Sequence, residues 1–172
     1  MSYSIAMTMR RLLFPRHKLS CSWFLWQRLV HALRERGRGG TRESGAFLLG
    51  ARKAGCARIT DFVLYDDLDR HCLDTGIVRF DGRYYGALWA YAERTKRSVV
   101  ADVHVHPGEA FQSESDRRHP MIAQAGHIAL ILPWYAKPPL PRSQIRAYVF
   151  EERDQWHAIP PHEMRAFFYV GL

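Results

Sequence analysis

The chain has 172 residues, of which 47% are hydrophobic and 24% charged. This length suits one compact domain over residues 1–172 that buries its own core, and the apolar content excludes a wholly disordered chain. The formal net charge of +8 predicts an acidic partner surface or nucleic acid, and does not choose between them.

The three cysteines, Cys21, Cys56 and Cys72, are too few for a disulfide framework, and none forms a CxxC pair. Buried thiols in a reducing compartment are therefore expected. No stretch reaches the roughly 18 apolar residues of a membrane-spanning helix. The first 16 residues lack the apolar core of a signal peptide. These features predict a cytoplasmic protein without a membrane partner.

The first half of the chain alternates strands with one long helix. Apolar residues at positions 5, 7 and 9 predict a strand, because their period is two. Residues 20–36 predict an amphipathic helix that ends in the glycine-rich segment 36–42. Residues 43–50 read as a buried strand, and residues 57–65 as its hairpin partner. The apolar face of the helix is formed by Trp23, Trp26, Val30 and Leu33.

The second half predicts a further helix and several strands. The expected elements are a loop over 66–75, a helix over 84–95, a strand over 98–107, a strand over 127–132, a proline-rich loop over 136–144, a hairpin from 145–152 and 155–159, and a short helix after 160–161. This order predicts an α/β fold with a mixed sheet.

The segment HVHPGEAFQSESD, residues 104–116, contains the residues that indicate chemistry. His104 and His106 stand two apart in a predicted strand, so both imidazoles project from one face. Asp116, one loop later, supplies a third ligand. Two imidazoles and one carboxylate on Zn²⁺ leave a fourth position open, which is the arrangement of a catalytic zinc site.

Two further residues complete this predicted site. Ser113 lies three residues before Asp116 and is close enough to direct its hydroxyl at a developing oxyanion. Glu43 is the candidate base, because a carboxylate at the start of a buried strand requires a partner. The alternatives are an ion pair for Glu43, a helix N-cap for Asp116 and ordinary loop polarity for Ser113, with Ser115 as its competitor.

These residues resemble the JAMM motif of the JAB/MPN metalloprotease family. That motif is a Glu on a strand, followed far downstream by His-x-His-Pro, a Ser, two residues and an Asp. The glycine-bounded run GAFLLG after Glu43 and the segment 80–107 are also similar to the family, and the resemblance covers roughly residues 5–132. The loop between His106 and Ser113 is one residue shorter than is common, and Gln112 replaces a frequent proline.

The resemblance implies a single JAB/MPN-like domain with a mixed, mostly antiparallel, curved sheet flanked by helices. It implies one Zn²⁺ on His104, His106 and Asp116, with Glu43 moving protons and Ser113 stabilising the oxyanion. The implied activity is cleavage after the C-terminal Gly of a ubiquitin-like protein, in maturation or deconjugation. The resemblance also implies partners among the E1-like and E2-like enzymes of a bacterial conjugation operon, antiphage systems included.

Other functions stay open at this point. A non-catalytic MPN-type scaffold is one alternative, and a peptidase that processes sulfur-carrier proteins is another. A nucleic-acid partner is disfavoured, since the chain lacks a zinc finger, an RNA-binding aromatic motif and a basic recognition helix. The basic run over residues 34–42 is expected either to contact an acidic partner or to be solvated. His119 and His127 are expected to be outer or surface residues.

Overall fold

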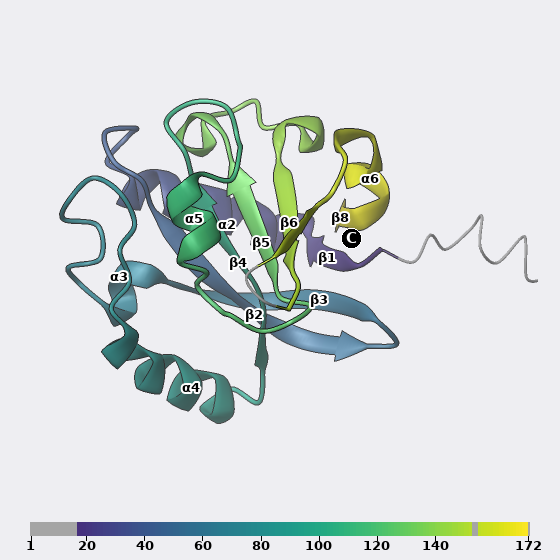
Figure 1. Ribbon diagram of the computed structural model, residues 1–172, viewed down its shortest axis with the longest axis horizontal. Helices are drawn as coiled ribbons and strands as arrows, with labels where there is room; N and C mark the ends of the chain where they lie inside the picture. The colour runs from purple at the N-terminus through teal and green to yellow at the C-terminus, as the bar shows by residue number, and fades with distance from the viewer. Residues whose placement is uncertain (1–16, 153–154, 172) are drawn as a thin grey trace, which may run out of the picture.

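One mixed sheet of eight strands organises the computed structural model, which describes residues 17–152 and 155–171 (Figure 1). The strands are β1 (Leu19–Ser22), β2 (Gly45–Lys53), β3 (Cys56–Leu64), β4 (Ser98–Val105), β5 (Ile128–Leu132), β6 (Arg146–Phe150), β7 (Trp156–Ala158) and β8 (Phe168–Gly171). Their order across the sheet is β7-β6-β5-β4-β2-β3-β1-β8.

The helices are short apart from two. They are α2 (Trp23–Arg36), α3 (Tyr65–Leu68), α4 (Tyr85–Arg94), α5 (Glu114–Arg118) and α6 (Met164–Phe167), with single 3₁₀ turns η1 (Gly82–Tyr84), η2 (Trp134–Ala136), η3 (Arg142–Gln144) and η4 (Pro161–Glu163). No helix in the described part of the chain is both long and apolar enough to cross a bilayer.

The strand pairings confirm the predicted fold class. β2 pairs antiparallel with β3 and with β4, and the β5–β6 and β6–β7 pairs are also antiparallel. The β4–β5, β1–β3 and β1–β8 pairs are parallel. The sheet is therefore mixed and mostly antiparallel, with helices flanking it as expected.

The two faces of the sheet carry different cores. α2 packs Leu29 and Leu33 on one face, together with Ala46 of β2 and Val103 of β4. α4 covers part of the other face, where Phe47 belongs to a smaller cluster of apolar side chains. Because side chains alternate along a strand, the residues next to Val103 in β4 face the α4 side.

The start of the chain differs from the prediction in two respects. The strand predicted around positions 5–9 lies outside the described residues. The predicted helix starts at Trp23 instead of residue 20, because residues 19–22 form strand β1 and the Ser22 hydroxyl accepts a hydrogen bond from the Leu25 N–H at 3.3 Å. Trp23 remains 51% exposed, so only part of the predicted apolar face is buried.

The cysteines are free thiols, as predicted. Cys21 and Cys72 are buried, and burial raises the pKa of each thiol to about 12. Cys56 is half-buried at the start of β3. A thiol with so high a pKa is a poor nucleophile at neutral pH, which agrees with structural roles for Cys21 and Cys72.

Candidate metal centre

The two histidines of the motif lie at the C-terminal end of β4. His104 is within the strand, His106 follows it directly, and both are buried. β4 is held between β2 and β5, with His104 paired to Gly45 on one side and to Ile131 on the other. Because β4 pairs with a strand on each side, its backbone is held in place. Both imidazoles therefore project from the same face of the sheet, as the i, i+2 spacing predicts.

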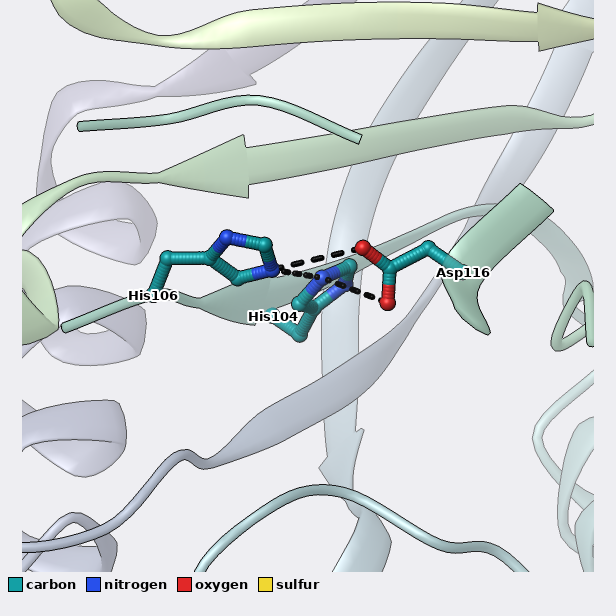
Figure 2. A group of neighbouring side chains, drawn as sticks. All are labelled: His104, His106 and Asp116. Carbon is teal, nitrogen blue, oxygen red and sulfur yellow. Dashed lines mark hydrogen bonds and ion pairs between the residues drawn. The ribbon is translucent and has the colours of Figure 1, made fainter. Parts of the chain in front are cut away.

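Asp116 reaches the histidines from the short helix α5 (Figure 2). The Nε2 atoms of His104 and His106 lie 3.0 Å apart. Asp116 Oδ1 lies 3.5 Å from His104 Nε2, and Asp116 Oδ2 lies 3.4 Å from His106 Nε2. The structure therefore brings together all three residues that the sequence predicted as metal ligands, and each offers one ligand atom to the group.

The spacing of these atoms fits a tetrahedral metal ion. Ligands at about 2.0–2.2 Å from a tetrahedral ion lie roughly 3.3–3.6 Å from one another. The two nitrogen–oxygen distances, 3.5 and 3.4 Å, fall in this range although they run to different carboxylate oxygens, and the nitrogen–nitrogen distance of 3.0 Å is shorter. A bound cation would accept the lone pairs of two imidazoles whose Nε2 atoms are unprotonated, together with a lone pair of the ionised carboxylate. The donor set of two nitrogens and one oxygen suits zinc, and His104, His106 and Asp116 are the residues that would hold it.

Electrostatics at the site favour a cation. Burial lowers the pKa of His104, but the contact with Asp116 and the charges of Asp102 and Glu43 outweigh this and raise it overall. Burial likewise opposes ionisation of Asp116, yet contacts with His104, His106 and the Ser113 side chain lower its pKa well below the usual range. Asp116 therefore contributes a permanent negative charge to this group.

Glu43 lies at the entry to β2, two residues before the strand begins at Gly45. The Val105 N–H donates to the Ser44 carbonyl at 3.0 Å, so contact between the two segments continues beyond the strand as far as Ser44, the residue next to Glu43. The Val78 N–H donates to Glu43 Oε2 at 3.3 Å. Its carboxylate is half-buried and outside the three-residue group.

Ser113 is the N-cap of α5. Its hydroxyl oxygen accepts a hydrogen bond from the Asp116 N–H at 3.1 Å, and its own N–H donates to Asp116 Oδ2 at 2.8 Å. This reciprocal pair is a capping box, and it fixes the carboxylate that faces the histidines. This cap uses the Ser113 hydroxyl as an acceptor and does not use its proton.

Replacing Ser113 by Ala separates these two roles. Loss of the hydroxyl cap should lower the free energy of unfolding by about 1 kcal/mol. The Ser113 N–H that holds the Asp116 carboxylate is a backbone group that Ala keeps, so zinc affinity should change by less than roughly tenfold. Ser113→Thr keeps the hydroxyl and should restore the stability. Zinc titration and thermal unfolding measure the two quantities. A larger loss of zinc affinity in Ser113→Ala would show that the hydroxyl, and not the N–H alone, orients Asp116.

A buried polar cluster that the sequence reasoning missed lies next to His104. Asp102, two residues earlier in β4, accepts a hydrogen bond from the Tyr65 hydroxyl at 3.1 Å, and its other oxygen lies 2.5 Å from His127 Nε2. Asp102 and His127 are both buried. The alternation Asp-x-His-x-His could have indicated Asp102, since all three side chains share a face.

A pocket of about 560 Å³ opens beside the candidate metal ligands. His104 and Asp116 form part of its wall, Asp102 lines it, and Phe80 and Tyr85 add aromatic surface. His119 also lines the pocket and is exposed, which agrees with the expected outer role. A substrate group next to the metal ligands therefore has a partly apolar cavity to enter.

The basic run over residues 34–42 is divided between structural and exposed roles. Arg36 pairs with Asp66 and Asp67, at 2.8 Å to each. Arg42 donates from Nε to the Arg36 carbonyl at 2.7 Å. These two arginines hold the segment after α2 in place. Arg34 forms no ion pair with a residue in the described ranges 17–152 and 155–171.

Comparison with known sequences gives an informative relative. A scan against known protein families finds no match. A protein of Sinorhizobium fredii named a probable metalloprotease is 26% identical over 73 residues. The match covers 42% of this chain and 44% of that protein, so the chain spans less than half of its relative's length. With the JAMM-like motif, this match supports a JAB/MPN-type family.

Solved structures share the fold at low sequence identity. A protein from Desulfitobacterium hafniense has a TM-score of 0.64 and 14% identity, over 88% of this chain and 92% of that one. A protein from Salinibacter ruber has a TM-score of 0.50 and 19% identity, over 80% and 85% of the two chains. A JAB1/MPN domain protein from Archaeoglobus fulgidus has a TM-score of 0.48 and 13% identity, over 88% and 96%.

Proposed function

We propose that this chain is a zinc-dependent JAMM-type peptidase or isopeptidase that cleaves after the C-terminal Gly of a ubiquitin-like protein. The observation that carries the proposal is the convergence of His104, His106 and Asp116, with Glu43 at the entry to β2, the strand that pairs with β4. The match to a probable metalloprotease supports the metallopeptidase part. The ubiquitin-like substrate rests on the resemblance of the motif.

Zinc held by His104, His106 and Asp116 would polarise a carbonyl and make a water a stronger acid. Glu43 is the general base in this proposal: its carboxylate takes a proton from the attacking water and passes it to the leaving amine. Its half-buried position and its hydrogen bond from the Val78 N–H hold the carboxylate at one place. Position matters because proton transfer requires hydrogen-bond distance to the reacting group.

Ser113 supports the reaction through two groups. Its N–H fixes the Asp116 carboxylate, and its hydroxyl proton is available to an oxyanion that develops as the carbonyl is attacked. The pocket lined by His104, Asp116 and Asp102 offers a cavity to one side of the scissile bond. E1-like and E2-like enzymes of a bacterial conjugation or antiphage system are the partners that we propose for this activity.

Two alternatives have a specific basis. A peptidase for sulfur-carrier proteins would use the same site, so only the substrate differs. A non-catalytic scaffold needs the fold without the chemistry. The presence of the complete set of Glu43, His104, His106, Ser113 and Asp116 favours the enzyme, since a scaffold has no use for a proton acceptor beside three convergent ligands.

The deciding experiment uses a ubiquitin-like protein whose C-terminal Gly is fused to a reporter. The zinc-loaded chain should release the reporter, with mass spectrometry placing the cut after the Gly. A metal chelator should abolish cleavage and added zinc should restore it, because zinc supplies the Lewis acid. Cleavage that persists after chelation contradicts the metal mechanism. No cleavage of ubiquitin-like or sulfur-carrier fusions by zinc-loaded protein favours the scaffold.

A further inference from the structure

A second, smaller pocket lies at the segment that follows His106. It has a volume of about 250 Å³, and its walls come from the end of α2, the turn that follows it, and the segments after β4 and β5. Pro107, which directly follows His106, is one of its lining residues. We call this cavity the Arg34 pocket.

Backbone hydrogen bonds tie the Arg34 pocket to the candidate metal centre. The Tyr135 N–H donates to the His106 carbonyl, and the Trp134 N–H donates to the Gly108 carbonyl, each at 2.8 Å. The η2 turn and the loop after β4 therefore lie together at one end of the sheet (Figure 1). A polypeptide bound at the metal centre would reach this pocket within a few residues.

The pocket is cationic. Arg34 and Lys137 both line it, and none of its lining residues is acidic. Neither cation forms an ion pair with any residue that the structure describes. Arg36, only two residues from Arg34, is by contrast occupied by Asp66 and Asp67. Two uncompensated cations in one cavity provide a site for an anion.

The η2 turn, which forms one wall of the pocket, has an unfavourable backbone conformation. Trp134, Tyr135 and Ala136 all have positive φ values, of 53°, 52° and 56°, which non-glycine residues rarely adopt. A Cβ on Gly40, whose φ is +106°, would come within 3.2 Å of the Tyr135 ring. Trp134 is 49% exposed, so burial of its indole does not account for the conformation of this turn. Such a strained turn beside a candidate active site points to a ligand-binding role.

We propose that the Arg34 pocket binds a carboxylate of the substrate, on the His106 side of the scissile bond, with the Trp134 indole packing against the adjoining residue. This inference deepens the proposed function and rests on it, because it assigns a charge preference to that same site. The carboxylate belongs either to an acidic side chain or to the end of a chain. The chemistry of recognition is the same for both, and the probes below separate them.

The test measures binding of three fluorescent peptides that share an internal Gly-Gly. One has a Glu three residues from the Gly pair and an amidated C-terminus, the second has Lys instead, and the third is neutral with a free C-terminal carboxylate. Binding is measured by fluorescence polarisation to the full chain, both metal-free and as zinc-loaded Glu43→Gln. We expect at least one carboxylate peptide to bind roughly tenfold more tightly than the Lys peptide, the order expected of two ion pairs near the surface.

The double variant Arg34→Gln/Lys137→Gln should remove this preference, leaving a ratio of dissociation constants of roughly one to two. Added salt should weaken the wild-type preference. The matched control is Arg58→Gln/Lys53→Gln, which removes the same charges from exposed positions on β3 and β2 that do not line the pocket. The control should retain the wild-type ratio, and thermal unfolding checks that both doubles are folded.

The possible results separate this inference from the proposed function. A preference for the Glu peptide assigns a side-chain carboxylate, and a preference for the free-ended peptide assigns a terminal one. An absent preference, or one that survives in Arg34→Gln/Lys137→Gln, overturns the Arg34 pocket as an anion site. Binding of the peptides to the metal-free chain requires neither zinc nor cleavage. If the chain prefers a carboxylate peptide but does not cleave the ubiquitin-like fusion, the result counts against the proposed function and not against the Arg34 pocket.

Discussion

Replacing Glu43 by Gln is expected to lower cleavage of a Gly-terminated ubiquitin-like fusion by about 10²–10⁴-fold, the usual contribution of a positioned general base. Gln keeps an oxygen that can accept the hydrogen bond from the Val78 N–H, so the entry to β2 should be unchanged. Glu43 lies outside the three convergent ligands, so zinc content should also hold. Steady-state kinetics, zinc analysis and circular dichroism measure the three quantities.

The kinetic pattern identifies the role of Glu43. A base acts only in the transition state, so kcat should fall while substrate affinity is retained. Glu109→Gln is the matched control, because Glu109 is an exposed carboxylate in the loop between His106 and Ser113. It should keep full activity. Full activity in Glu43→Gln means that another base is used, and loss of zinc means that Glu43 is a ligand or a structural support.

The convergence of His104, His106 and Asp116 was predictable because their arrangement is largely local. Alternation along one strand places His104 and His106 on a common face, and a short helix returns Asp116 to them. The sequence motif also indicated Ser113, but not its full role. The pattern Ser-x-x-Asp is a capping-box signature, and the structure shows that Ser113 itself, not Asp116, is the helix N-cap.

The residues that were missed depend on pairings between distant segments. His127 meets Asp102 only because β5 lies parallel to β4, with Ala129 in register with Asp102. Strands β1 and β8 were not predicted, because each is four residues long and pairs with a segment far away in sequence. The left-handed turn at Trp134 likewise has no sequence signal, since non-glycine residues rarely adopt that conformation.

Replacing His106 by Ala is expected to remove zinc from the protein. His106 supplies one of three convergent ligand atoms, so its loss should weaken zinc binding by more than the 10- to 100-fold that an outer partner contributes. His119→Ala is the matched control, because His119 lines the neighbouring pocket but lies outside the ligand group. Elemental analysis of purified protein should give about one zinc per chain for the wild type and the control.

His106 is buried and its ring packs edge-on against Phe111, with ring centroids 5.2 Å apart, so its truncation also leaves a cavity. Asp116→Asn provides a second test, because it preserves shape while removing the charge that faces both imidazoles. Binding of Co²⁺, followed by the visible spectrum of a tetrahedral ion, should be lost in His106→Ala and weakened in Asp116→Asn. Loss of an imidazole from a three-ligand site must alter the geometry of the bound ion. If folded His106→Ala keeps stoichiometric Co²⁺ with an unchanged visible spectrum, the ion is therefore held elsewhere.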